Sequence, residues 1–159
     1  MATIPSGLII GGVTLLVALA GRLVRSSDAS WFYNLQTPEW LTFEWAIPLI
    51  WTIIFICGAW SAYLVWKQNP GSSQTWLRMG LFLLLEIAII AYIPSILWFR
   101  NLTIGTVVGG LGIVLGLLLI GLVWPVSSRA GLLLLPYLLW SPIGTFTTWQ
   151  MIQLNPNAV

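Results

Sequence analysis

The stretch Leu102–Trp124, LTIGTVVGGLGIVLGLLLIGLVW, decides the fold because it contains no charged residue and is long enough to cross a membrane. A transmembrane helix needs about 20 consecutive apolar residues to cross roughly 30 Å of hydrocarbon. The apolar residues run continuously and do not alternate with polar ones, which favours a helix over a strand of a transmembrane barrel. This segment therefore predicts a helical membrane protein.

Four other apolar stretches of similar length lie on either side of this segment, at residues 4–23, 45–66, 77–99 and 130–154. With the segment 102–124 they predict an all-α integral membrane protein, a five-transmembrane-helix bundle that forms a single domain over residues 1–159. Lys and Arg residues divide equally between the two ends of the spans, so the positive-inside rule gives no orientation. We expect a multi-pass protein of a bacterial or organellar membrane.

The link between the first two spans, residues 26–44, is long for a compact bundle, and loops of this length are often functional. It is rich in aromatic residues: Trp31, Phe32, Tyr33, Trp40 and Phe43. Trp and Tyr favour the membrane interface. We therefore expect this loop to pack over one mouth of the bundle or to lie in the headgroup layer.

The composition agrees with a membrane protein and excludes several functions. The 159 residues are 58% hydrophobic and 6% charged, with a mean hydropathy of +0.95, whereas soluble domains are about 25% charged. Without His, the chain has no His-ligated metal and no Ser/His/Asp triad, and its single Cys57 allows no internal disulfide. A net charge of +2 without a basic cluster excludes a nucleic-acid partner. No catalytic residue, metal or cofactor is predicted.

A stripe of small residues follows one face of the segment 102–124. It consists of Gly105, Gly109, Gly112 and Gly116. Glycines at this spacing let helix backbones approach closely in lipid. The stripe predicts either packing inside the bundle or a homodimer seam.

Glu86 is an acidic residue inside the span 77–99. A carboxylate within the membrane is costly, so it should face a partner, water or the bundle interior. Two roles remain open: a hydrogen-bonded structural role, or the lining of a cavity.

The tryptophans divide by position. Those at span ends are typical of interface anchors: Trp45, Trp66, Trp76, Trp98 and Trp124. Trp51 and Phe55 lie deeper and share a helix face at i, i+4 spacing. If Trp140 faces them, the three form an aromatic box for a flat polycyclic ligand; core packing alone is the alternative.

Prolines are expected to break or kink three of the spans, because proline lacks a backbone donor. They are Pro48, Pro94, Pro136 and Pro142. Kinks in three helices are consistent with a bundle that encloses a pocket.

Three runs carry aromatic motifs: Leu35–Trp40 (LQTPEW), Ala62–Trp66 (AYLVW) and Leu134–Trp140 (LLPYLLW). Together they resemble the TspO/translocator-protein family, also called tryptophan-rich sensory proteins or peripheral benzodiazepine receptors. The family patterns are roughly L-x-K-P-x-W, Y-L-V-W and L-L-x-P-Y-L-x-W. The resemblance covers most of the chain from about Trp31 onward. The chain departs from it at Thr37, where the family has Lys, and at Ala91, where it has Asn.

The resemblance implies a five-helix bundle with a cavity that opens toward the first loop, and ligands such as porphyrins and sterols. Carried over by position, the ligand-binding residues are Trp51, Phe55, Trp140, Pro48, Gly144 and Ala91, with Trp31 and Tyr33 in the covering loop. The expected function is binding, transport or sensing of tetrapyrroles or sterol-like molecules. Two alternatives remain: light- and oxygen-dependent porphyrin breakdown by Trp51 and Trp140, and a structural or assembly subunit that packs through its glycine faces.

Overall fold

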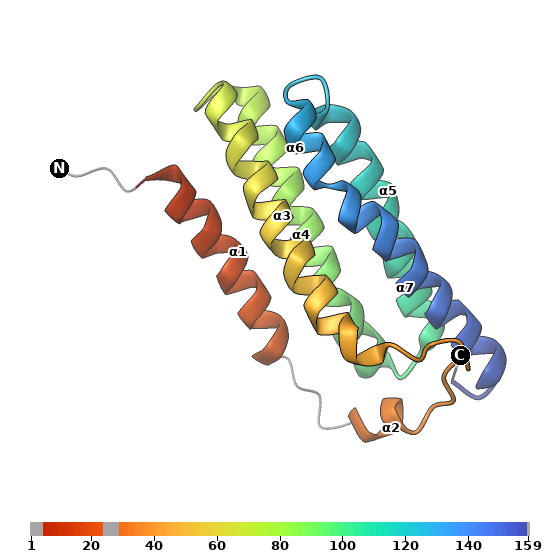
Figure 1. Cartoon of the computed structure of the whole chain (residues 1–159). Coiled ribbons are helices and arrows are strands. Elements are labelled where there is room, and N and C mark those ends of the chain that lie inside the picture. Colours follow the sequence, from red (N-terminus) through yellow and green to blue (C-terminus); the bar gives the residue numbers. More distant parts are fainter. Residues whose placement is uncertain (1–4, 24–28, 159) are drawn as a thin grey trace.

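The structure, a computed structural model, describes residues 5–23 and 29–158, and all regular secondary structure in these ranges is helical (Figure 1). In chain order the elements are α1 (Ser6–Leu23), α2 (Ala29–Tyr33), the 3-10 helix η1 (Glu44–Ala46), α3 (Ile47–Gln68), α4 (Ser73–Phe99), α5 (Leu102–Val123), α6 (Ser128–Leu133) and α7 (Leu135–Leu154). The prediction of an all-α protein is confirmed for the part of the chain that the structure describes.

Within residues 5–23 and 29–158, four helical segments are long and apolar enough to cross a membrane. They are Glu44–Gln68, Ser73–Phe99, Leu102–Val123 and Ser128–Leu154. The apolar part of α1, Ser6–Ala20, falls short of the same length. The structure thus supports four of the five predicted spans by length and composition. Two predicted boundaries lie outside the described residues. They are Ile4, the predicted first residue of the first span, and Ser26, the predicted first residue of the long loop.

Side-chain caps determine where the long helices begin. The hydroxyl of Ser72 accepts a hydrogen bond from the backbone N–H of Thr75 (3.1 Å), so α4 begins at Ser73 and not at the predicted residue 77. The amide oxygen of Asn101 caps α5 in the same way. Arg100 adopts a left-handed conformation (φ 48°) that ends α4 and turns the chain directly into α5.

The prolines act differently from one another. Pro136 stands in the first turn of α7, and the predicted span 130–154 is divided there into α6 and α7. Proline lacks the N–H that would continue the helix from α6. Pro48 lies in the first turn of α3, where its missing N–H breaks no hydrogen bond of the helix. A proline at this position therefore does not force the kink that was expected in this span. Pro94 and Pro142 lie inside α4 and α7.

The glycine stripe of α5 packs inside the bundle. All of its members are buried: Gly105, Gly109, Gly112 and Gly116. A side chain added at these positions would meet Ile96 of α4 and Thr145 and Tyr137 of α7. At Gly116, an added Cβ would lie 2.5 Å from the Tyr137 ring. This face of α5 is therefore covered by α4 and α7, and it is not open for the homodimer seam that the sequence left as an alternative.

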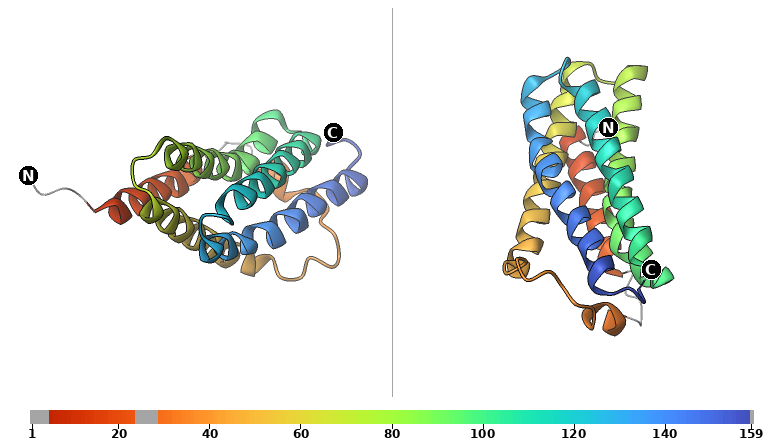
Figure 2. Two further views of the ribbon diagram at one scale, coloured as in Figure 1. Left: turned by 90° about the horizontal axis from the view of Figure 1, so that it is seen from above. Right: turned by 90° about the vertical axis from the view of Figure 1, so that its right-hand side faces the viewer.

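The main core lies between α3, α4, α5 and the α6–α7 pair. Its buried residues include Ile54, Val65, Phe82, Leu85, Leu119, Val123, Leu134 and Tyr137. A second cluster, Ile96, Leu102, Met151 and Ala158, lies at the end of the bundle where α4 turns into α5, and Trp31 and Phe32 of α2 pack against it. The two views in Figure 2 show α2 and the chain that follows it at this end of the helices. The long loop thus covers one end of the bundle.

One polar contact joins α1 to α4 in the middle of the apolar region. The hydroxyl of Thr14 donates a hydrogen bond of 2.6 Å to Oε1 of Glu86. Thr14 is buried, and Glu86 stands midway along α4. The hydrogen-bonded role considered for Glu86 is therefore present in the structure.

Thr14→Val should loosen α1 by about 1 kcal/mol, because hydrogen bonds between membrane helices contribute about that much. The free energy of unfolding in detergent would show the loss. In the background of Glu86→Leu, the same substitution should have no further effect. Equal losses in both backgrounds would show that the hydrogen bond does not hold α1.

Candidate functional site

A small cavity between α3, α4, α5 and α7 brings together two of the predicted ligand residues, Trp51 and Gly144. Its volume is about 30 Å³. The other walls come from Ala88, Ile89, Tyr92, Val108, Gly109, Gly112, Tyr137, Ser141 and Thr145. We call this the Trp51 cavity. It is small because Gly109 and Gly112 of α5 let α7 approach closely on one of its sides.

Several hydroxyl groups around the Trp51 cavity are paired within the protein. The hydroxyls of Tyr92 and Thr148 are hydrogen-bonded to each other across α4 and α7. The hydroxyl of Thr145 donates to the carbonyl oxygen of Ser141 at 2.9 Å. Because these groups already have partners, the cavity would bind a ligand through its shape and its apolar surface more than through hydrogen bonds.

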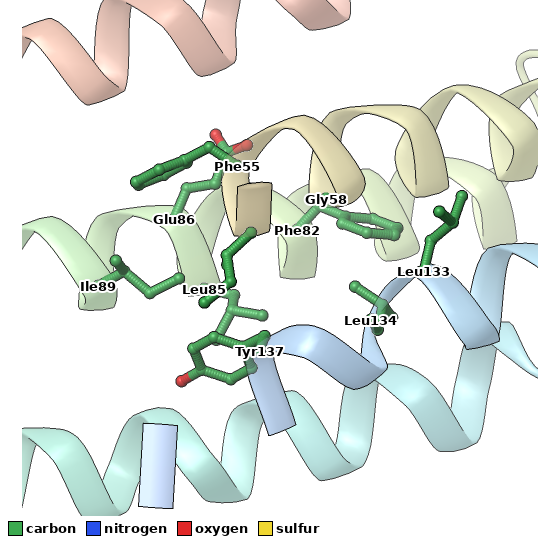
Figure 3. Close-up of a pocket in the computed structure, with 10 residues that line it drawn as sticks. Phe55, Gly58, Phe82, Leu85, Glu86, Ile89, Leu133, Leu134 and Tyr137 are labelled. Carbon is green, nitrogen blue, oxygen red and sulfur yellow. The ribbon is translucent and has the colours of Figure 1, made fainter. Parts of the chain in front are cut away.

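A second small cavity, of about 20 Å³, lies next to the first and shares Ile89 and Tyr137 with it. Phe55, the third predicted ligand residue, lines this cavity and not the Trp51 cavity. Figure 3 shows the ring of Phe55 and the carboxyl group of Glu86 on one side, with the Tyr137 ring on the opposite side. The core therefore contains two adjoining voids along α4.

The predicted aromatic box is only partly assembled. The rings of Trp51 and Phe55 are close, with centroids 6.5 Å apart. Trp140 packs on the same core but has its ring next to Phe43 of the loop, at 6.3 Å. Phe43 of the loop thus lies beside Trp140, at the place where the sequence predicted Trp51 and Phe55 of α3.

Besides Trp140, which lines neither cavity, four predicted site residues lie away from them. Tyr33 is 82% exposed, with its ring edge-on to Phe32. Pro48 and Ala91 are also exposed, and Trp31 packs against the cluster at the α4–α5 turn. Tyr33, Pro48 and Ala91, which the resemblance placed at the site, do not line either cavity in this structure. Their part in ligand binding stays a prediction.

The structure adds two site residues that the sequence did not single out, Tyr92 and Thr148. Tyr and Thr are both common in membrane spans, so neither residue marks a site by its type. Their hydrogen bond forms only because α4 packs against α7. A polar hydroxyl at the same depth in two spans would have been the only signal in the sequence.

The loop is attached along α7 by polar and aromatic contacts. Backbone groups of Gln36 make two hydrogen bonds of 2.9 Å with the side chain of Asn155. The indole N–H of Trp40 donates to Oε1 of Gln150 at 2.5 Å, and its ring stacks on Phe146 with centroids 6.3 Å apart. We call residues 34–43 with these contacts the strap. It holds Phe43 against Trp140.

Comparison with known proteins identifies relatives over nearly the whole chain. Residues 9–154 match the model of the TspO/MBR family. The tryptophan-rich protein TspO of Chlorobaculum tepidum is 30% identical over 151 residues, which cover 91% of this chain and 92% of the relative. The translocator protein of Bos taurus is also 30% identical, over 91% of this chain and 88% of its own. The tryptophan-rich sensory protein of Cereibacter sphaeroides is 26% identical, over 88% and 85%.

The family match extends from α1 to the end of α7, and the described helices supply at least four segments able to cross a membrane. The chain is a multi-pass integral membrane protein and belongs to the TspO/MBR family.

Proposed function

We propose that this protein binds flat, apolar ligands within the membrane, either tetrapyrroles such as porphyrins and haem precursors or sterol-like molecules, for transport or sensing. The observation that carries the proposal is the cavity that joins Trp51 with Gly144, in the core against which Trp140 also packs. The names of the relatives, translocator protein and tryptophan-rich sensory protein, support the same general role. The proposal includes α1 as a fifth span of a single domain.

The volume of the cavity sets a condition on this function. Sites for ligands of this size usually measure about 300–1,000 Å³, and the Trp51 cavity measures about 30 Å³. A tetrapyrrole therefore enters only if the strap releases and Phe43 leaves Trp140. The ligand then takes the place of the Phe43 ring, and stacking on Trp140 replaces the lost aromatic contact.

The double variant Trp51→Ala, Trp140→Ala should bind protoporphyrin IX at least about tenfold more weakly than the unmodified protein. Each aromatic stack contributes roughly 1 kcal/mol beyond buried area, and tenfold corresponds to about 1.4 kcal/mol. A titration of the porphyrin absorption band, with the protein in lipid nanodiscs, measures the affinity.

The matched control is the double variant Trp45→Ala, Trp98→Ala, which also removes two indoles. Both of these side chains are exposed, at 79% and 81%, and lie away from the Trp51 cavity. It should bind the porphyrin as the unmodified protein does. Equal affinities for the two double variants would overturn the proposed site.

A further inference from the structure

A cavity larger than the two described above lies outside the proposed site, between α1, α3 and α4, and has a volume of about 420 Å³. Its walls are apolar except for Ser6, Thr14 and Glu86. We call it the α1 cavity. Figure 1 shows α1 on the side of α3 and α4 away from α5 and α7. Its volume is in the range of sites for drug-sized molecules.

The α1 cavity and the Trp51 cavity have no lining residue in common. The second small cavity adjoins both, because it shares Phe82 and Glu86 with the α1 cavity and Ile89 and Tyr137 with the Trp51 cavity. Trp66, near the end of α3, and Trp76, near the start of α4, line it, whereas the strap leads into the opposite end of α3. The Trp66 and Trp76 rings meet edge to face with centroids 5.0 Å apart. They form a rigid aromatic wall at the end of the cavity away from the strap.

Glu86 gives the α1 cavity one defined polar position. Oε1 of its carboxyl group accepts the hydrogen bond from Thr14, and both residues line the cavity. Thr14 is the one hydrogen-bond partner that Glu86 has among the described residues, so the carboxyl group retains acceptor capacity. In an apolar surrounding, a further donor at this group lowers the cost of keeping it inside the membrane.

With α1 as a fifth span, as proposed above, a molecule can enter this cavity from the membrane. Ile9 and Leu83 line it and are 53% and 40% exposed on helices that face lipid. A molecule that enters between them has to be soluble in hydrocarbon, and a charged amine would lose its hydration on the way. A hydroxyl group loses less and can still donate to the carboxyl group.

From these observations we propose that the α1 cavity is a second binding site, which takes an uncharged apolar molecule with one hydroxyl group that donates to Glu86. The occupant is a lipid alcohol, either a free long-chain alcohol or a membrane lipid with a free hydroxyl such as a diacylglycerol. The two sources share the same chemistry, an apolar body with a single donor.

Photolabelling tests this proposal on the full chain in phosphatidylcholine nanodiscs. The probes are a long-chain alcohol with a diazirine group, the matched alkane diazirine without the hydroxyl, and a diazirine-bearing diacylglycerol. The alcohol should label the segment 79–86 saturably and at least tenfold more strongly than the alkane. Labelling of the same segment by the diacylglycerol identifies a membrane lipid as an occupant, and labelling by the alcohol alone identifies a free alcohol.

Gly80→Leu provides the cavity-filling variant. Gly80 lines the cavity, and a Cβ added there meets no heavy atom within 4 Å, so a larger side chain begins in open space at the cavity wall. Labelling by the alcohol should fall at least tenfold. The matched control is Gly144→Leu, which enters the Trp51 cavity and whose added Cβ also meets no heavy atom within 4 Å. It should leave this labelling unchanged.

The double variant Thr14→Val, Glu86→Leu tests the polar contact, because it removes both partners and leaves no unpaired group. It should label equally with the alcohol and with the alkane. The proposal is overturned if labelling of the segment 79–86 does not saturate, if the unmodified protein shows no preference for the alcohol, or if Gly80→Leu labels normally.

The test is independent of the porphyrin site. Gly80→Leu should bind protoporphyrin IX normally, and Gly144→Leu should not. Loss of alcohol labelling in Gly144→Leu alone would mean that the alcohol occupies the Trp51 cavity, and would overturn the proposal.

Discussion

Gly109→Leu is expected to destabilise the protein by at least about 3 kcal/mol, because the new side chain would enter the space already filled by Thr145 of α7. Overpacking of a tight core costs about 1–3 kcal/mol and sometimes more. Here both the Thr145 hydroxyl and its methyl group are in the way, and Thr145 is held by its hydrogen bond to Ser141. The free energy of unfolding in mixed detergent micelles measures the effect.

The matched control is the next residue in the same helix. A Cβ at Gly110 meets no heavy atom within 4 Å, so Gly110→Leu should be neutral or slightly stabilising, because Leu favours the helix over Gly. Both variants have the same composition and hydropathy, so membrane insertion does not distinguish them. Equal stabilities would show that α5 does not pack on α7 through this face. Loss of self-association without loss of stability would instead place Gly109 at a homodimer seam.

Sequence patterns predicted the spans well because a helix in lipid needs a continuous apolar run. The predicted segment 102–124 corresponds to Leu102–Val123, and 45–66 corresponds to Glu44–Gln68. The glycine stripe was also readable, because glycines at i, i+4 and i+7 leave one face of a helix bare for a close neighbour. Its partner was not readable, because Tyr137 and Thr145 become its neighbours only when α7 folds back along α5.

The direction in which each residue faces could not be predicted from hydrophobicity. In a membrane, the lipid-facing and core-facing sides of a helix are both apolar, so no amphipathic pattern marks the cavity wall. Ala91 was placed at the site by position in the family motif, yet it is exposed, while Tyr92 beside it lines the Trp51 cavity. Gly144, assigned by the same reasoning, does line that cavity.

The α1 cavity and the strap depend on contacts between distant parts of the chain. Thr14 and Glu86 are 72 positions apart, and Gln36 and Asn155 are 119 apart. The sequence offered Glu86 as a costly carboxyl group and left its role open. The structure shows that it fulfils both of the roles considered, since it is hydrogen-bonded to Thr14 and lines a cavity.

Asn155→Ala should release the strap from α7. The side chain of Asn155 accepts from the backbone N–H of Gln36 and donates to its carbonyl oxygen, each at 2.9 Å, and it also donates to the carbonyl oxygen of Met151. Only the two hydrogen bonds to Gln36, both exposed to solvent, join the strap to α7, and together they contribute about 1.4 kcal/mol. Their loss raises the equilibrium constant for undocking by roughly tenfold. Hydrogen exchange of a peptide that covers residues 34–43 measures this change.

The matched control for this variant is Asn157→Ala, which removes the same side chain from an exposed position two residues further on. It should exchange like the unmodified protein.

If the strap is the gate of the Trp51 cavity, Asn155→Ala should also accelerate porphyrin association, because Phe43 leaves Trp140 more often. Trp40, whose indole bonds to Gln150, keeps part of the strap in place, so the effect should grow further when Gln150→Ala is added. Unchanged hydrogen exchange in Asn155→Ala would show that the aromatic contacts alone hold the strap.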